Sequence, residues 1–207
     1  KVSYVETADG SKVHGKNFIS NMHPVRTLDM TESNLIKQAY KHRVKSLENS
    51  IGGFVVNIVF EKNTYPYIKN NFYYIKDGQE WNLTEYNDET WPSCYAVFCS
   101  ASSKSPDYAE SMTLLAYMKF DEVKQWAGTF NTVSKEEDRG KDYEAFKKIK
   151  AEKLLSLVEE RFPGVRKAIK SYYTATPLSY RDYIGNDDGS MYGIAKDYSN
   201  PLKTFIS

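Results

Sequence analysis

The alternation of apolar and polar positions changes its period along the chain, and each change predicts a different element. At the start, two stretches of extended character, Val2–Glu6 and Lys12–Ser20, flank the turn sequence Ala8-Asp9-Gly10. An Asp-Gly turn between two such stretches is typical of a β-hairpin. The sequence therefore predicts a hairpin at the start of the chain, and the break at Asn21-Met22-His23-Pro24 ends it.

A helical period follows this hairpin. Pro24 can open a helix, because the first helical position needs no N–H group, and Thr31-Glu32-Ser33-Asn34 offers side chains that could cap a second helix. Apolar residues then recur three and four positions apart, which marks one face of that second helix. These residues are Ile36, Tyr40, Val44 and Leu47. The pair Gly52-Gly53 is expected to end the helix.

Longer apolar stretches predict a sheet in the middle of the chain. Phe54–Phe60 (FVVNIVF) has the composition of a buried strand, and the aromatic stretch Tyr67–Asp77 is extended in character. Two further strands are predicted at Cys94–Ser100 and Met112–Phe120. The polar stretch Ser102–Asp107 is expected to join these two strands as a hairpin loop.

The longest helix is predicted from about Lys141 to Arg161, with Phe162-Pro163-Gly164 as its stop. Its expected apolar side consists of Tyr143, Phe146, Ile149, Leu154, Leu157 and Val158. A short helix at Phe120–Val123 precedes it, and Val165–Thr174 alternates loosely enough for another strand. Together these elements predict an α+β fold, in which a largely antiparallel or mixed sheet is covered by helices on one face.

The charges exclude one class of partner. The chain has 28 basic and 27 acidic side chains and a formal charge of +1, whereas a general nucleic-acid binder needs a clustered basic excess to neutralise phosphates. The densest basic cluster, Lys147-Lys148-Ile149-Lys150, stands among glutamates in the predicted long helix. A solvated helix face explains this cluster. We therefore expect no nucleic-acid partner.

The cysteines and histidines indicate neither a disulfide nor a metal site. Cys94 and Cys99 are five positions apart, so on one strand their side chains point to opposite faces and cannot bridge. The three histidines are scattered and have no metal-ligand spacing relative to the cysteines. Low cysteine usage fits a reducing compartment. We therefore expect a cytoplasmic protein.

Aromatic content is the unusual feature of the composition. The chain has 17 Tyr, 10 Phe and 3 Trp residues, which make up 14% of it. A tyrosine ring covers apolar surface while its hydroxyl still needs a polar partner. Such a composition suits β-strands, and it also suits the walls of a cavity for a large, flat ligand. Composition alone leaves both interpretations open.

Near the end of the chain, Thr174–Gly193 (TATPLSYRDYIGNDDGSMYG) combines three glycines with two adjacent aspartates. Pro177 is expected to open a short helix, Gly185 to end it in the left-handed conformation, and Gly189 to take a positive φ in a tight turn. These roles leave Tyr192-Gly193 unexplained, because a glycine after the closed turn lets another group approach the backbone. This stretch is therefore a helix stop and also a candidate ligand-facing loop.

Two segments resemble those of a known flavoprotein family. They are FISNMHPVRTLDM (Phe18–Met30) and TPLSYRDYIGNDDGSMYG (Thr176–Gly193). They resemble segments of the phytoene desaturase, carotenoid isomerase and retinol saturase group of FAD-dependent, amine-oxidase-type oxidoreductases. The two segments stand in the family's order, and the residues between them look like the family's substrate-binding region. The resemblance spans nearly the whole chain, although its specific motifs cover only about thirty residues.

The resemblance implies a reaction at carbon–carbon double bonds of a conjugated polyene or other isoprenoid lipid: desaturation, saturation or isomerisation. FAD is the implied cofactor, with NAD(P) as a further candidate, and the flavin supplies the difficult chemistry. The implied cofactor-binding residues are Ser20, Asn21, His23, Pro24, Tyr192 and Gly193. The implied substrate-binding residues are Tyr180, Arg181, Gly185 and Gly189. No catalytic residue is implied.

Two of these residues also have structural interpretations. His23 can cap a helix or pack beside Pro24, since a lone histidine is more often structural. Arg181 can pair with Asp182, Asp187 or Asp188, an interaction that stabilises little if it is exposed. The sequence leaves both alternatives open.

The family's glycine-rich flavin segments are missing from this sequence. The resemblance therefore implies the middle of a longer flavoprotein, which alone does not hold FAD. Residues 1–30 would form a hairpin and a strand that returns to the flavin domain, and residues 31–175 would form the substrate-binding domain. Residues 176–207 would lead back to the flavin domain. The first and last residues also look cut from a longer chain.

A second class of function stays open, namely a non-catalytic module that binds a glycan or a partner protein. Its candidate contact residues are Trp81, Tyr86 and Trp91 in the loop-like stretch EWNLTEYNDETW. No apolar run approaches the roughly 20 residues that a membrane-spanning helix needs. Peripheral contact with a membrane is a weaker hypothesis, for which Val165–Tyr173 is the best candidate. The sequence does not indicate an oligomeric state.

Overall fold

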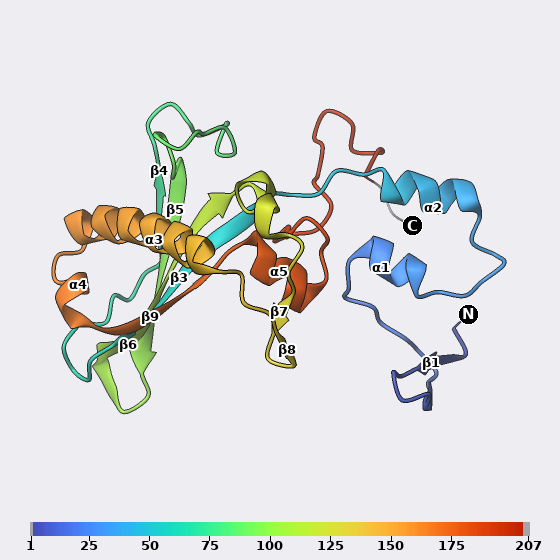
Figure 1. The fold of residues 1–207 in the computed structure, drawn as a ribbon, viewed down its shortest axis with the longest axis horizontal. Helices are drawn as coiled ribbons and strands as arrows, with labels where there is room; N and C mark the ends of the chain where they lie inside the picture. The colour runs from blue at the N-terminus through green and yellow to red at the C-terminus, as the bar shows by residue number, and fades with distance from the viewer. Residues whose placement is uncertain (1, 205–207) are drawn as a thin grey trace. The chain divides into compact units, whose positions relative to one another are not determined.

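The structure is a computed structural model that describes residues 2–204, and it confirms the predicted α+β fold (Figure 1). The chain forms two compact units, of which the first ends at Leu47 and the second begins at Glu48. The expected division of the chain into residues 1–30, 31–175 and 176–207 refers to contacts with a flavin domain, and it stays a prediction. Residues 205–207 of its last segment lie outside the described residues.

The first unit contains the predicted hairpin. Strands β1 (Tyr4–Glu6) and β2 (Lys12–His14) pair antiparallel. Gly10 takes a φ of 82° in the turn between them, a backbone conformation that glycine adopts without strain. The strands are shorter than the sequence suggested, because no third strand pairs with them among the described residues.

Two helices complete the first unit. Helix α1 (Pro24–Asp29) has the proline at its first position, as expected, and helix α2 (Gln38–Lys45) buries Val44 completely. The caps expected at Thr31-Glu32-Ser33-Asn34 are not used, because α2 begins only after Lys37, which makes no side-chain cap. An ion pair of 2.6 Å between Lys45 and Asp29 joins the two helices.

The second unit is built on one five-stranded antiparallel sheet. Its strand order is β4-β5-β6-β3-β9. The strands are β3 (Gly52–Phe60), β4 (Phe72–Ile75), β5 (Cys94–Ser102), β6 (Ser105–Met118) and β9 (Ile169–Ala175). The four strands predicted from apolar runs are therefore present, and the hairpin loop between β5 and β6 is tighter than expected.

The long helix α3 (Lys141–Arg161) has the predicted bounds and covers one face of the sheet (Figure 1). In the sheet register Val56 lies opposite Leu114, and Leu114 lies opposite Val97. All three side chains are buried in one cluster with Leu154 of α3. This cluster is the hydrophobic core of the unit.

The sequence misjudged which residues of α3 face the sheet. Ile149 was expected on the apolar side but is 68% exposed. It stands five residues before Leu154, which at 100° per residue rotates it about 140° away from the core-facing side. Lys150, expected on a solvated face, is buried instead. Its aliphatic stem reaches the core, and its ammonium group pairs with Glu122 at 2.6 Å.

Short elements connect the sheet and the helix. They are two 3₁₀ turns (Phe120–Glu122 and Lys124–Trp126), strands β7 (Asn131–Thr132) and β8 (Lys135–Glu136), and helices α4 (Val165–Ala168) and α5 (Pro177–Ile184). The expected strand at Val165–Thr174 is therefore a helical turn followed by β9. Val165 and Ala168 are buried in the core, so this segment does not present them to a membrane.

Two negative expectations agree with the structure. Cys94 and Cys99 are free thiols, and the register of β5 places them on opposite faces of the sheet. None of the helices formed by residues 2–204 has the length and apolar character needed to cross a membrane.

Candidate functional site

The sheet has a second face, on the side away from α3, that no helix among residues 48–204 covers. Burial alternates along β6: Met112, Leu114 and Ala116 are buried toward α3, while the residues between them are half-buried. We call this second side the open face. From the register it consists of Tyr73, Ile75, Cys94, Ala96, Phe98, Thr113, Leu115, Tyr117, Gly53, Val55, Asn57, Tyr173 and Ala175.

Most of the open face is apolar or aromatic. Val55 and Ala96 are buried by their neighbours but lie outside the core cluster. Tyr73 and Tyr173, on the two edge strands, are about two-thirds exposed, at 70% and 68%. A contiguous apolar surface of this kind is typical of a binding site. The polar residues in the middle are Asn57 and Thr113, and the Asn57 side-chain carbonyl accepts a hydrogen bond of 2.9 Å from the Thr113 hydroxyl.

The segment with the family-like motif begins as a helix packed on the covered side of the sheet. Thr176 caps helix α5 through a capping box, and Leu178 is buried in the core. Gly185 ends the helix in the left-handed conformation, with φ 83° and ψ 19°. Gly189 has a φ of 63°. The predicted conformations of both glycines are confirmed.

The motif segment then passes close to the start of β3. A Cβ atom on Gly52 would lie 2.8 Å from the Gly189 carbonyl oxygen, and one on Gly53 would lie 2.7 Å from the sulfur of Met191. The expectation that Gly52-Gly53 ends a helix was wrong. These glycines open a strand, and their missing side chains let the motif segment cross from the covered side to the open face.

Backbone hydrogen bonds hold the motif segment in place. The Ser50 N–H donates to the Gly193 carbonyl at 2.7 Å, and the Tyr192 N–H donates to the Ser50 hydroxyl at 3.0 Å. Gly193 has a φ of 67°, which explains the glycine that turn chemistry left unexplained. The Tyr192 side chain is 69% exposed. It is therefore available to a ligand, whereas Gly193 has a structural role.

Tyr192 of the motif segment has an electrostatic effect on two other tyrosines. Burial, and secondarily the neighbouring Tyr192, raise the pKa of Tyr117. The same two causes, in the same order, raise the pKa of Tyr180. Tyr117 and Tyr180 are therefore neutral hydroxyls at physiological pH, close to the exposed ring of Tyr192. The electrostatic effect of Tyr192 therefore reaches both Tyr180, a predicted residue, and Tyr117 of β6.

Arg181 is part of a buried ion cluster. Its side chain donates to Asp182 at 2.7 Å and to the carbonyl oxygens of Ala127, at 2.7 Å, and of Thr129. The Asp182 side chain is 0% exposed and also pairs with Arg139. The structural interpretation of Arg181 is therefore confirmed. The cluster ties α5 to the β7–β8 hairpin, because Asp182 also accepts the Asn131 N–H at 2.9 Å.

Arg139 was not singled out from the sequence, and Asp182 was named only as one of three candidate partners of Arg181. No local pattern links them, since 43 positions separate them. The pair Gly52-Gly53 did carry a usable signal. Glycine directly before a buried apolar strand indicates close approach of another backbone.

The first family-like segment lies in the first unit, where it forms helix α1. The Nδ1 atom of His23 accepts the Val25 N–H at 3.3 Å and caps helix α1, which Pro24 opens. The Ser20 and Thr27 hydroxyls are 2.6 Å apart. Asn21 is exposed. The capping interpretation of His23 is confirmed, and contact of these residues with a flavin stays a prediction.

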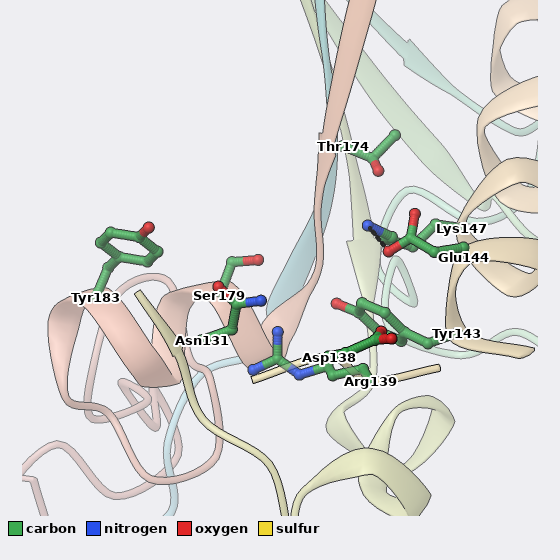
Figure 2. A pocket seen from close by; sticks show the side chains of 9 residues that line it. All are labelled: Asn131, Asp138, Arg139, Tyr143, Glu144, Lys147, Thr174, Ser179 and Tyr183. Carbon is green, nitrogen blue, oxygen red and sulfur yellow. Dashed lines mark ion pairs between the residues drawn. The ribbon is translucent and has the colours of Figure 1, made fainter. Parts of the chain in front are cut away.

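A polar cavity of about 200 Å³ lies beside α5 (Figure 2). Side chains from α3, β9, α5 and the β7–β8 hairpin line it. Figure 2 shows Arg139 on its wall with Asp138 and Asn131 beside it, and the Glu144–Lys147 ion pair further along. Its lining is charged and hydroxylic, whereas the open face is largely apolar.

The three residues proposed to contact a glycan or a partner protein, Trp81, Tyr86 and Trp91, do not form one exposed surface. Trp91 is only 1% exposed, and its indole N–H donates to the Tyr117 carbonyl at 2.7 Å. The Tyr86 hydroxyl donates to Glu122 at 2.6 Å and accepts the Lys119 N–H. Both therefore have packing roles, because a buried indole or phenol needs its polar atom satisfied. Trp81 alone of the three is exposed.

The described side chains also form no metal site. Within residues 2–204, no group of three or more His, Cys, Asp or Glu side chains is arranged to hold a metal ion. Comparison with known proteins gave no assignment: no protein-family model matches the chain, and no curated protein matches its sequence. The family resemblance therefore rests on the two quoted motifs alone.

Proposed function

We propose that this chain is the substrate-binding part of a flavin-dependent oxidoreductase that acts on a conjugated polyene or another isoprenoid lipid. The observation that supports this proposal most is the open face, which combines apolar and aromatic side chains with the motif residue Tyr192 at one end. A long, flat hydrocarbon is the ligand that such a surface binds best.

The physical basis is burial of apolar surface. Each Å² removed from water contributes about 25 cal/mol, so a ligand that covers about 200 Å² of the open face gains about 5 kcal/mol before the costs of association. Tyr73, Phe98 and Leu115 would contact the carbon chain along the sheet. The hydroxyls of Tyr117 and Tyr180 stay neutral and can donate hydrogen bonds to one end of the ligand.

FAD, when bound, would exchange hydride or electrons with the carbon chain. The described residues do not fit FAD by themselves, because none of them forms a glycine-rich turn that leads into a helix and could receive the pyrophosphate. We therefore derive no catalytic step from this chain. Its role in the proposal is to bind and orient the lipid and to exclude water from it.

A thiol-protection experiment tests the lipid site. Cys94 lies on the open face and Cys99 on the covered side, both half-buried, and burial raises the pKa of both thiols. Cys99→Ser leaves only Cys94, and Cys94→Ser is the matched control that leaves only Cys99. Saturating retinol should slow alkylation of Cys94 severalfold and leave Cys99 unaffected. Equal rates with and without retinol at Cys94 would overturn the lipid site.

The flavin part of the proposal has its own test. The complete reading frame that contains this chain should yield a protein that purifies yellow, with FAD released on denaturation. A complete protein that lacks flavin and is not reconstituted by added FAD would contradict it. We also propose a cytoplasmic location, consistent with the two free thiols.

A further inference from the structure

The polar cavity beside α5 contains a buried cation with an unused hydrogen-bond donor. The Arg139 side chain is only 6% exposed, and its Nη2 atom pairs with Asp182. Its Nε atom is buried and has no hydrogen-bond partner among the described residues. A buried donor without an acceptor is destabilising, and more so when it carries charge. This position therefore calls for an acceptor.

Arg139 shares its ion-pair partner with a second arginine. Asp182 carries one negative charge and is shared by two guanidinium groups, those of Arg139 and Arg181. Arg181 donates its remaining hydrogen bonds to the backbone carbonyls of Ala127 and Thr129. The ion-paired cluster therefore has two guanidinium groups and one carboxylate, and the unused donor belongs to Arg139. A hydrogen bond from Lys135 and, to a smaller extent, the nearby charge of Arg139 lower the pKa of Glu137.

The other carboxylates of the cavity are engaged elsewhere. Asp138 is exposed and accepts the Gly140 N–H at 2.7 Å. Glu144 pairs with Lys147 at 2.8 Å. Because neither has a hydrogen bond to Arg139, they leave its Nε atom free.

We propose that this cavity binds a small oxyanion group, a carboxylate or a phosphate, through the Nε–H of Arg139. The hydroxyls of Ser179 and Thr174 line the same cavity and can donate to the remaining oxygens. Hydrogen bonds between a guanidinium and an oxyanion are among the strongest in proteins. The cavity volume of about 200 Å³ restricts the ligand to a small molecule or one group of a larger one. This inference is independent of the proposed lipid site.

The experiment titrates the 207-residue chain with acetate and, separately, with inorganic phosphate, at ionic strength kept constant with chloride. The Nε–H resonance of Arg139 in ¹⁵N-resolved NMR reports occupancy directly, and the two titrations distinguish the carboxylate from the phosphate source. We expect saturable shifts of this resonance with at least one of the two anions.

Two variants separate the site from general charge effects. Arg139→Lys keeps the charge but removes the Nε–H, so we expect binding at least about tenfold weaker, the size of one charge-assisted hydrogen bond. Arg166→Lys is the matched control, because Arg166 forms an ion pair with Glu152 outside the cavity. Binding should be unchanged in that variant.

Three outcomes would overturn the proposal: no saturable shift of the Arg139 resonance with either anion, equal affinity in Arg139→Lys, or equal loss in Arg166→Lys. If Arg139→Lys does not fold, the wild-type resonance decides alone, and Ser179→Ala supplies the second variant. Ser179→Ala should then weaken anion binding by a smaller factor, about threefold, since it removes a neutral donor.

Discussion

Gly189 shows how a single missing side chain sets the position of the motif segment. Its φ is 63°, and a Cβ atom there would lie 2.1 Å from the Pro177 carbonyl oxygen, which is backbone and cannot give way cheaply. The substrate contact that the resemblance implies for Gly189 stays a prediction. Its observed role is to let the chain pass α5 on the way to the open face.

Gly189→Ala should therefore lower the free energy of unfolding by about 3 kcal/mol or more, because strain and steric overlap add. Gly78→Ala is the matched control. Gly78 also has a positive φ, 76°, but no atom lies within 4 Å of its added Cβ, so only the conformational cost of about 1 kcal/mol applies. Urea denaturation of both variants checks this, and equal losses would contradict it.

Asp182 is the residue on which the buried ion cluster depends. Asp182→Asn keeps the shape but leaves two buried guanidinium groups without a counter-charge, so we expect a loss of about 3 kcal/mol or more in unfolding free energy. Asp121→Asn removes an exposed partner of Lys124 at 4.0 Å and should cost under about 0.5 kcal/mol. Thermal unfolding measures both losses. If Asp182→Asn lowered the unfolding free energy no more than Asp121→Asn, the proposed role of Asp182 would be wrong.

Tyr86 makes the stability of the fold depend on pH in the alkaline range. Burial, then the hydrogen bond to Glu122, raise its pKa far above the ordinary value of 10.0. The raised folded-state pKa stabilises the fold fully below pH 10, and this contribution is lost as the pH rises above 10, because the unfolded state then loses the proton more readily. Tyr86→Phe should lose about 1–2 kcal/mol at pH 8 and show a shallower decline from pH 10 to 12. Denaturation of the wild type and the variant at several pH values from 8 to 12 tests both expectations. If the unfolding free energy of the variant fell as steeply with pH as that of the wild type, this role of Tyr86 would be contradicted.

At the scale of elements, the sequence predicted where helix α3 begins and ends, but not which of its sides packs on the sheet. Its bounds follow from the stop at Phe162-Pro163-Gly164 and the length of the helical period. The buried side of α3 could not be predicted, because it includes Lys150. This lysine is buried through ion pairs with Glu122 and Asp88, which are far away in the sequence. Long-range ion pairs leave no mark in a local pattern.

The facing of α3 is itself testable. Leu155→Ala should lower the unfolding free energy by about 2–5 kcal/mol, because Leu155 is buried and its truncation leaves a cavity. Ile149→Ala, on the exposed side of the same helix, should change it by under about 1 kcal/mol. Chemical denaturation would contradict the observed packing if the two losses were similar.

The candidate site was predictable only in part, for a related reason. The glycine turn before Tyr192 marked that residue in the sequence, whereas only the family resemblance marked Tyr180. The sequence did not mark Tyr117 or the open face, since strand order and register decide which residues share a face, and neither can be read from one strand. Arg139 was missed because its partner Asp182 is brought close only by the tertiary fold.

At the scale of the whole molecule, the second unit places two different surfaces on one framework. The sheet presents a largely apolar open face on the side away from α3, and the polar cavity lies beside α5. The motif segment contributes to both, through Met191 and Tyr192 on the first and Ser179 on the second. A bound lipid and a bound oxyanion would therefore contact the same stretch of chain from two sides.

The most direct test of the central claim is an isotope-filtered NOE measurement between unlabelled retinol and the ¹³C-labelled chain. If the open face binds the lipid, intermolecular NOEs should connect retinol methyl groups with the side chains of Tyr73, Leu115 and Tyr117. The side chains of Val56 and Leu114, on the covered face, should show none. Saturable binding with NOEs only to other surfaces, or no binding at all, would contradict the claim.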